Sequence, residues 1–162
     1  MSTLRPVAPR EVGEVVGSYS GLSRKVLEYS LIMKRLVDRA KQPGFSVQSW
    51  APLAELVAVD EFERVGNFKE VMNWHDYVEF LTKWAPASDW ECSFKRITES
   101  QGVVFLELEE RSKTGEARSV VNSVSVYEFD RAGKIRHLDI YLQMALPGSE
   151  MLKSYEGVRI SA

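Results

Sequence analysis

Three polar residues that could transfer protons alternate with three aliphatic residues near the end of the chain, in the stretch FDRAGKIRHLDIYLQM. The polar set is His137, Asp139 and Tyr141, and the aliphatic set is Leu138, Ile140 and Leu142. Successive side chains of a β-strand point to opposite faces of a sheet, so the two sets lie on different faces. Because ligand cavities are mostly apolar, we expect the aliphatic set to line a cavity and the polar set to face outward.

Two further runs of alternating residues are expected to share the inner face with the aliphatic set. Residues 118–129 add Ser123, Ser125 and Tyr127, whose hydroxyl groups could donate hydrogen bonds to a ligand. Residues 102–112 add Leu106 and Leu108, provided that the turn around Gly115 keeps the pairing in register. A slip of one residue would turn all of these side chains to the other face.

Three amphipathic helices are expected before these strands. The first covers GLSRKVLEYSLIMKRLVDRAK, in which apolar residues recur at helical spacing, and a Pro-Gly pair ends it. The second begins near Ser49 as its N-cap. The third covers NWHDYVEFLTKW, where Asn73 can cap the helix and Asp76 can bond back to it. The segment EFERVGNFKEV between the second and third helices is typical of an extended chain, with a bend at Gly66.

Composition indicates a single globular domain. The chain has 162 residues, of which 44% are hydrophobic and 27% charged, and its formal net charge is −2. That balance argues against a nucleic-acid partner and against binding to an anionic membrane. The single cysteine, Cys92, cannot form an internal disulfide, and no apolar run is long enough to span a membrane or resembles a signal peptide, so we expect a cytoplasmic protein.

The order of elements, helices first and then a meander of long strands, predicts an α+β fold. We expect the helices to pack on one face of a curved antiparallel sheet and to enclose an apolar cavity. Residues 1–18 would form an arm, residues 19–146 the domain, and residues 147–162 a tail.

Two motifs, LAELVAVDEF and VYEFDRAGKIRHLDIYLQ, resemble the NTF2-like superfamily, which includes ketosteroid isomerase, limonene epoxide hydrolase, scytalone dehydratase and the SnoaL polyketide cyclases. The resemblance extends roughly from Gly21 to Met144. It implies a cone-shaped fold whose pocket is lined by the aliphatic set of the last strand, and a homodimer formed through the outer face of the sheet. The superfamily contains both enzymes and binding proteins, so the fold does not give the function.

The catalytic patterns of the known enzymes are not matched. By the resemblance, the general base of the ketosteroid isomerases falls on Val65, the oxyanion acid on Ser125, and the oxyanion tyrosine near Val37. The Asp-Arg-Asp set of the epoxide hydrolases falls on Ser123, Ser125 and Ile140. The terminal acidic residue of the SnoaL cyclases is Gln143 here, and an amide is neither a general acid nor a general base.

Two other residues remain as candidate acids or bases. Glu63 lies two residues before Val65 and would therefore point with it into the cone, where burial would raise its pKa toward neutrality. It could instead pair with Arg64 or Lys69 at the surface. His75, in the first turn of the third helix, is either an acid or base at the pocket mouth or a neutral surface residue.

Three hypotheses follow. The chain could be an enzyme that acts on a small, largely apolar molecule, steroid-like or polyketide-like, with Glu63 as acid or base and Tyr127 and Ser125 as hydrogen-bond donors. It could bind such a molecule without catalysis, or it could be a dimeric interaction module that uses its outer face. Two distant histidines give no metal-ligand spacing, and we expect no metal and no cofactor.

Overall fold

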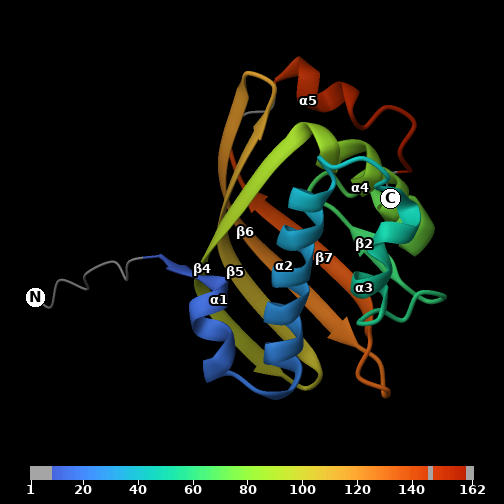
Figure 1. Cartoon of the computed structure of the whole chain (residues 1–162). Coiled ribbons are helices and arrows are strands. Elements are labelled where there is room, and N and C mark those ends of the chain that lie inside the picture. Colours follow the sequence, from blue (N-terminus) through green and yellow to red (C-terminus); the bar gives the residue numbers. More distant parts are fainter. Residues whose placement is uncertain (1–8, 146–147, 160–162) are drawn as a thin grey trace, which may run out of the picture.

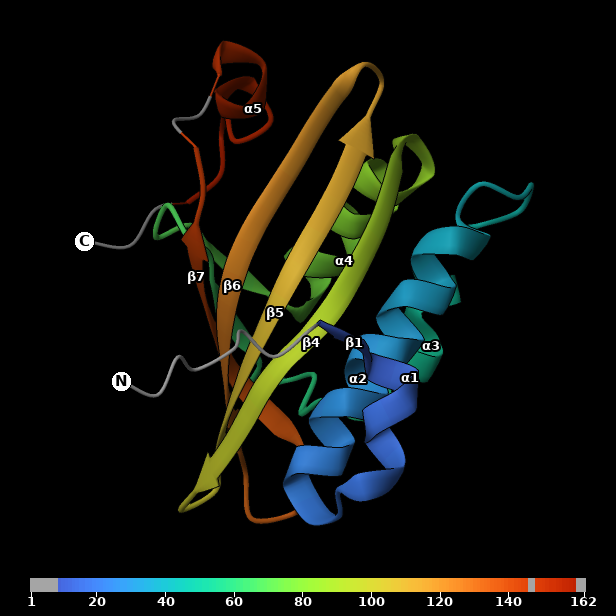
Figure 2. The same ribbon diagram turned by 90° about the vertical axis from the view of Figure 1, so that its left-hand side faces the viewer.

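The computed structural model describes residues 9–145 and 148–159. A long curved sheet forms one layer, and the helices between residues 12 and 84 pack against its concave face, while the last short helix lies beyond the end of the sheet (Figures 1 and 2). The helices are α1 (Val12–Val15), α2 (Gly21–Arg39), α3 (Ala51–Ala54), α4 (Trp74–Trp84) and α5 (Ser149–Lys153), with short 3-10 turns at Val16–Ser18, Val47–Trp50 and Ala85–Ala87. The α+β prediction is confirmed.

Seven strands form the sheet, in the order β1-β4-β5-β6-β7-β2-β3. Their bounds are β1 (Arg10–Glu11), β2 (Glu63–Val65), β3 (Val71–Asn73), β4 (Ser88–Ser100), β5 (Val103–Thr114), β6 (Ala117–Phe129) and β7 (Ile135–Gln143). Neighbouring strands are antiparallel, except that β2 pairs with β7 in parallel. The parallel pair brings a short strand from between the helices beside the last strand of the meander.

The register of the meander is the expected one. Leu106 pairs with Ser125, and Leu108 pairs with Ser123, so the turn at Gly115 introduces no slip. The next pairing places Ser123 opposite Leu142, Ser125 opposite Ile140, and Tyr127 opposite Leu138. Paired residues share a face, so all eight of these side chains lie on the inner face that the helices cover.

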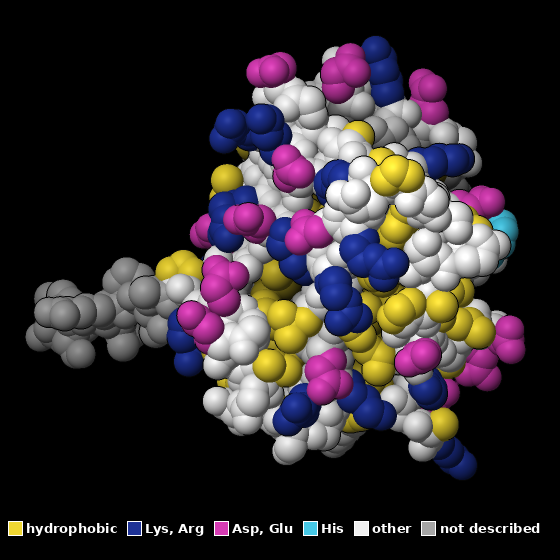
Figure 3. All heavy atoms as spheres, in the orientation of Figure 1, with side chains coloured by type: hydrophobic (Ala, Val, Ile, Leu, Met, Phe, Trp, Pro, Cys, Tyr) yellow, Lys and Arg dark blue, Asp and Glu magenta, His cyan; other side chains and the backbone are white. Residues whose placement is uncertain are grey.

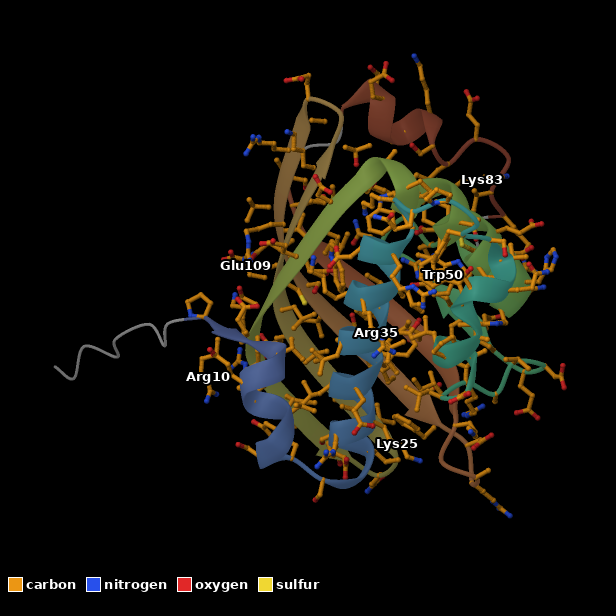
Figure 4. The ribbon with its side chains drawn as sticks, viewed as in Figure 1. Arg10, Lys25, Arg35, Trp50, Lys83 and Glu109 are labelled. Carbon is orange, nitrogen blue, oxygen red and sulfur yellow. The ribbon has the colours of Figure 1, made fainter. Side chains whose placement is uncertain are left out.

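Helix α2 supplies most of the helical side of the core. Its apolar stripe includes Val26, Leu27, Leu36 and Val37, each with no exposed surface. Lys25 in its second turn donates to the carbonyl of Gly133 in the turn before β7 (2.9 Å), and Figure 4 shows this lysine beside that end of the sheet. The helix therefore contacts the sheet both through the core and through the turn that joins β6 to β7.

Part of the expected N-terminal arm, residues 1–18, packs against the domain. From Arg10 onward the expected arm is packed structure, because β1 pairs with β4 and the side chains of Val12 and Val15 are 3% and 2% exposed. Residues 1–8 lie outside the described part of the chain. The second helix is also shorter than expected, and Ser46, not Ser49, caps its leading 3-10 turn. The α-helix after this turn, α3, has only four residues, and Pro52 lies in its first turn.

The described surface has no patch of a single charge sign on the face that carries α2. Figure 3 shows basic and acidic side chains mixed across it. In the described residues, no helix is both long enough and apolar enough to cross a membrane.

The β2–β3 hairpin depends on a glycine at its bend. Gly66 donates its N–H to the carbonyl of Glu70 (2.9 Å), and the Glu70 side chain folds back over the glycine. A Cβ at position 66 would lie only 1.6 Å from the Glu70 carboxylate oxygen, while the Glu70 side chain is 1% exposed and has no free space to move into. Gly66 is thus required for the burial of Glu70, not for turn conformation.

We expect Gly66→Ala to lower the free energy of unfolding by about 2–4 kcal/mol, because the new methyl group must expel the buried carboxylate from its partners. Gly13→Ala is the matched control, since its Cβ would meet only Leu31 at an ordinary 3.9 Å. Urea denaturation of both variants measures the difference. Equal stability of the two variants would contradict this account of the hairpin.

Candidate functional site

Arg64 of β2 points into the interior. The parallel register pairs Arg64 with Leu138, which is 1% exposed on the inner face of β7. The side chain of Arg64 is only 14% exposed, and its guanidinium carbon lies 5.0 Å from the centre of the Tyr77 ring on α4. This is the geometry of a cation–π contact. A charged group therefore lies among the core side chains.

Glu70 at the start of β3 supplies the counter-charge. One of its carboxylate oxygens lies 3.5 Å from Arg64 Nη1, and the other accepts the N–H of Phe68 (2.9 Å). Among the described residues Glu70 is the one carboxylate that is buried. Arg64 and Glu70 thus form a buried ion pair with no net charge, which is the arrangement that limits the cost of burying either group.

Three buried tyrosines from different elements extend from this pair into the core, beginning with Tyr77 against Arg64. Tyr29 comes from α2, Tyr77 from α4 and Tyr127 from β6, and their side chains are 3%, 7% and 4% exposed. The rings of Tyr29 and Tyr127 meet edge to face, with centroids 5.6 Å apart. We call Arg64, Glu70, Tyr29, Tyr77 and Tyr127 the interior cluster. It joins both layers of the fold.

Tyr29 and Tyr127 of the interior cluster remain protonated. Burial raises the pKa of Tyr29 well above its ordinary value, and the nearby Tyr77 and Tyr127 raise it further. Burial likewise raises the pKa of Tyr127. For Arg64, burial lowers the pKa, but the electrostatic interactions with Tyr77 and Glu70 outweigh this effect and the net shift is upward. The cluster therefore offers neutral hydroxyl donors and a permanent cation.

Several donors on this inner face have no hydrogen-bond partner in the described part of the chain. They are the hydroxyl of Tyr29, Nε of Arg64 and the hydroxyl of Ser123. A buried polar group without a partner costs about 1–3 kcal/mol, so such groups are uncommon in folded proteins. All three can donate a hydrogen bond to a ligand that presents an oxygen acceptor.

Glu63 and Val65 lie on the opposite face from Arg64. Glu63 pairs with His137 in the β2–β7 ladder and is half exposed, and its carboxylate lies 3.6 Å from His137 Nδ1. Val65 pairs with Asp139 in the same way. The inward orientation expected for Glu63 and Val65 is therefore wrong, and the residue between them, Arg64, is the one that points inward. The physical reason is that the parallel pairing with β7, which sets this orientation, is not visible in the local sequence.

The row His137, Asp139 and Tyr141 faces outward as expected. Nε2 of His137 lies 3.0 Å from the Asp139 carboxylate, and Tyr141 is 59% exposed. His137 therefore lies between two carboxylates, Glu63 and Asp139, on the outer face. No contact of this row reaches the interior cluster.

His75 also lies away from the interior, whereas Cys92 is buried in it. His75 has a side chain that is 75% exposed and lies 3.7 Å from Glu79, one turn further along α4. Cys92 lies on the inner face of β4, where burial raises the pKa of its thiol to about 12, so the thiol is protonated at neutral pH. In residues 9–145 and 148–159 no group of three or more His, Cys, Asp or Glu side chains is placed to hold a metal ion.

The expected pocket wall becomes more open along β7. Leu138 is buried, whereas Ile140 and Leu142 are only partly buried although they share its face. The surface has two depressions of about 330 and 320 Å³. The first is lined by residues of β4 to β7 that include Lys95, Tyr141, Ser123 and Leu142, and the second lies between α1, α2 and β4. An enclosed apolar cavity stays a prediction.

The described part of the expected tail packs beside the interior cluster. Tyr155 contacts the rings of Phe68 and Phe80, with centroids 5.4 and 5.9 Å away, and the carbonyl of Arg159 accepts the N–H of Val71 (2.7 Å). Burial raises the pKa of Tyr155, and the nearby Glu70 raises it further. The C-terminal segment thus covers the β2–β3 hairpin, although α5 itself is largely exposed.

The sequence analysis missed most of the interior cluster. Tyr127 was expected on the inner face, but Arg64 was considered only as a surface partner of Glu63, and Glu70 not at all. One feature of the sequence could have indicated the burial of Glu70. Gly66 stands four residues before Glu70, a spacing compatible with a hairpin in which the Glu70 side chain folds back over the glycine. Tyr29 and Tyr77 lie within amphipathic helices, where a tyrosine is usually a core residue.

Comparisons with known proteins rest on structure, since no protein-family profile and no curated protein matches the sequence. A protein described as a SnoaL-like polyketide cyclase, from Jannaschia sp. CCS1, has a TM-score of 0.55 and 13% identity, over 77% of this chain and 90% of that one. An NTF2-like protein of unknown function from Exiguobacterium sp. 255-15 has a TM-score of 0.56 and 13% identity, over 71% and 98%. An LEH-like epoxide hydrolase from Mycobacterium tuberculosis has a TM-score of 0.51 and 16% identity, over 70% and 84%.

These similarities cover most of each chain, and at 13% to 16% sequence identity they are evidence for the fold alone. The fold predicted from the two sequence motifs is confirmed: this chain has the NTF2-like fold.

Proposed function

We propose that this protein binds a small, largely apolar molecule between the sheet and the helices, through a neutral oxygen acceptor such as a ketone, and acts on it by acid/base chemistry. The observation that carries the proposal is the set of buried donors without partners, Tyr29 and Arg64 above all, in an otherwise apolar interior. A ligand oxygen would supply the missing hydrogen bonds, and the surrounding aliphatic and aromatic side chains would bind the rest of the molecule.

The charge of the interior cluster favours a neutral ligand. Arg64 is already compensated by Glu70, so a ligand carboxylate would bring an unpaired negative charge into the core. A ketone or ester oxygen accepts the same hydrogen bonds without that cost. Steroid-like and polyketide-like molecules combine such oxygens with large apolar surfaces.

Glu70 is the side chain best placed to act as a base. Tyr29 and Tyr127 hold their protons and Arg64 is a cation, so the carboxylate of Glu70 is the group of the described interior that could accept a proton. A carbonyl polarised by Tyr29 and Arg64 makes the hydrogen on the adjacent carbon more acidic. Removal of that hydrogen by a carboxylate begins isomerisations, cyclisations and dehydrations.

Binding without catalysis is the second candidate function. It is favoured by the position of Glu63 and His75, which both lie outside the interior, and by the ion pair that already engages Glu70. A binding protein needs the donors and the apolar wall but no free base.

We also propose a homodimer through the outer face of the sheet. Phe105, Val120 and Tyr141 are large hydrophobic side chains on that face, and they are 41%, 64% and 59% exposed. They are spread along the outer face among charged side chains such as the ion pair Arg96–Glu107, so a partner subunit would cover separate apolar side chains within a polar surface.

Tyr29→Phe removes one donor and should weaken the binding of androstanone, a rigid polycyclic monoketone, by about fivefold to tenfold. The free protein should be as stable as the wild type or more so, because the lost hydroxyl has no partner. Tyr141→Phe on the outer face is the matched control. Titration of tryptophan fluorescence measures affinity, and unchanged affinity in Tyr29→Phe would contradict the proposed orientation of the ligand.

Exchange of hydrogen for deuterium tests whether Glu70 acts as a base. The wild type should catalyse exchange of the hydrogens next to the carbonyl of androstanone in heavy water, as followed by mass spectrometry. Glu70→Gln should lower this rate by about 100-fold or more. Circular dichroism checks that this variant folds. Binding by the wild type without exchange above the buffer rate would establish the non-catalytic alternative.

Tyr141→Glu places a charge in the proposed dimer interface. We expect the wild type to sediment as a dimer and the variant to shift toward monomer, because a buried unpaired carboxylate is unfavourable. Analytical ultracentrifugation over a range of concentrations makes the measurement. A wild type that stays monomeric throughout that range would rule out the dimer.

A further inference from the structure

We propose that residues 155–159 form a flap that opens and closes over Glu70 and so controls access to the interior cluster. The inference rests on the proposed function, because it assigns the route by which a ligand reaches Arg64 and Glu70. Opening of the flap can be measured without a ligand, so the flap and the proposed function can fail separately. In Figure 1 this last segment descends from α5 toward α4.

The flap contacts the β2–β3 hairpin on both sides of Glu70. On one side the ring of Tyr155 meets the ring of Phe68 edge to face, with centroids 5.4 Å apart, and the backbone N–H of Phe68 bonds to the Glu70 carboxylate (2.9 Å). On the other side the carbonyl of Arg159 accepts the N–H of Val71 (2.7 Å). The flap therefore lies across the edge of the sheet at Glu70, whose side chain is 1% exposed.

Tyr155 interacts electrostatically with the buried ion pair. Burial raises the pKa of the Tyr155 phenol, Glu70 raises it further, and Arg64 lowers it. The ring of Tyr155 also contacts that of Phe80 on α4, with centroids 5.9 Å apart. Tyr155 thus fills the space between the hairpin and α4, and its departure opens a path from water to the Glu70 carboxylate.

The flap is attached more weakly than the elements that it covers. In the described residues 148–159, the side chains that pack on the domain are those of Tyr155 and Val158, both only partly buried. The hairpin beneath is held from a second direction, because Asn67 accepts the N–H of Leu142 at the end of β7 (2.9 Å). Segments with few buried contacts open at a lower free-energy cost than the core. The flap therefore opens while the hairpin stays in place.

Carbodiimide coupling of glycinamide to Glu70, mapped by mass spectrometry, measures opening, because a buried carboxylate reacts only when the reagents reach it. We expect Tyr155→Ala to raise the labelling rate of Glu70 about tenfold or more, since this ring is the largest apolar contact of the flap. Tyr155→Phe keeps the ring and should label at the wild-type rate. Leu152→Ala, at a side chain of the same segment that is 52% exposed, is the matched control.

Hydrogen exchange separates opening of the flap from unfolding of the domain. In Tyr155→Ala the amide of Val71, which bonds to Arg159, should exchange faster, while the amides of β5 and β6 keep their wild-type rates. Equal labelling of Glu70 in the wild type and Tyr155→Ala would overturn the flap. An equal increase in Leu152→Ala, or faster exchange throughout β5 and β6, would overturn it as well.

Ligand kinetics test whether the flap is the route of entry. In stopped-flow fluorescence with androstanone, Tyr155→Ala should raise the association and dissociation rates alike by about tenfold, so that the affinity changes little. Unchanged rates together with faster labelling of Glu70 would overturn the flap as the route of entry while the proposed function stands. Failure of androstanone to bind would overturn the proposed function, and the labelling of Glu70 would still decide whether the flap opens.

Discussion

The guanidinium of Arg64 is a full positive charge inside an interior of aliphatic and aromatic side chains, and several local features of the fold serve to accommodate it. Glu70 neutralises the charge, and Gly66 leaves the space in which the Glu70 carboxylate lies. Tyr77 of α4 presents its ring face to the cation. Removing either charge would leave the other buried and unpaired, which is far more costly than losing a surface ion pair. The hairpin and the helix above it are therefore coupled through one buried pair.

The two faces of the sheet have separate chemistry. The outer face has titratable groups in contact with water, among them His137 between Glu63 and Asp139. The inner face has hydroxyl groups whose protons are retained because burial disfavours their charged forms. A site on the inner face can therefore hold and polarise an oxygen, while proton transfer there depends on Glu70 alone among the described buried side chains.

The NTF2-like fold limits the possibilities without selecting among them. Solved structures with the same fold include proteins described as a polyketide cyclase and an epoxide hydrolase, at 13% and 16% identity. The catalytic patterns of such enzymes fall on valine, serine and isoleucine in this sequence. Those patterns predict that the carboxylate of Glu63 points inward. In the structure Arg64 points inward instead, and Glu63 faces the outer side of the sheet. The interior cluster is thus a property of this chain, and its chemistry has to be argued from its own residues.

Local patterns in the sequence are sufficient to predict the two long helices, the long strands and the two faces of those strands. Alternation along residues 118–129 and 135–143 places Ser123, Ser125 and Tyr127 with Leu138, because the period of a strand is a local property. The direction in which the short strand at residues 63–65 faces depends on tertiary pairing. That strand has three residues, too few for alternation to show, and its orientation follows from parallel pairing with β7, more than seventy positions later in the chain. Hence the wall of the site could be predicted, whereas the buried ion pair that gives the site its charge and its donors could not.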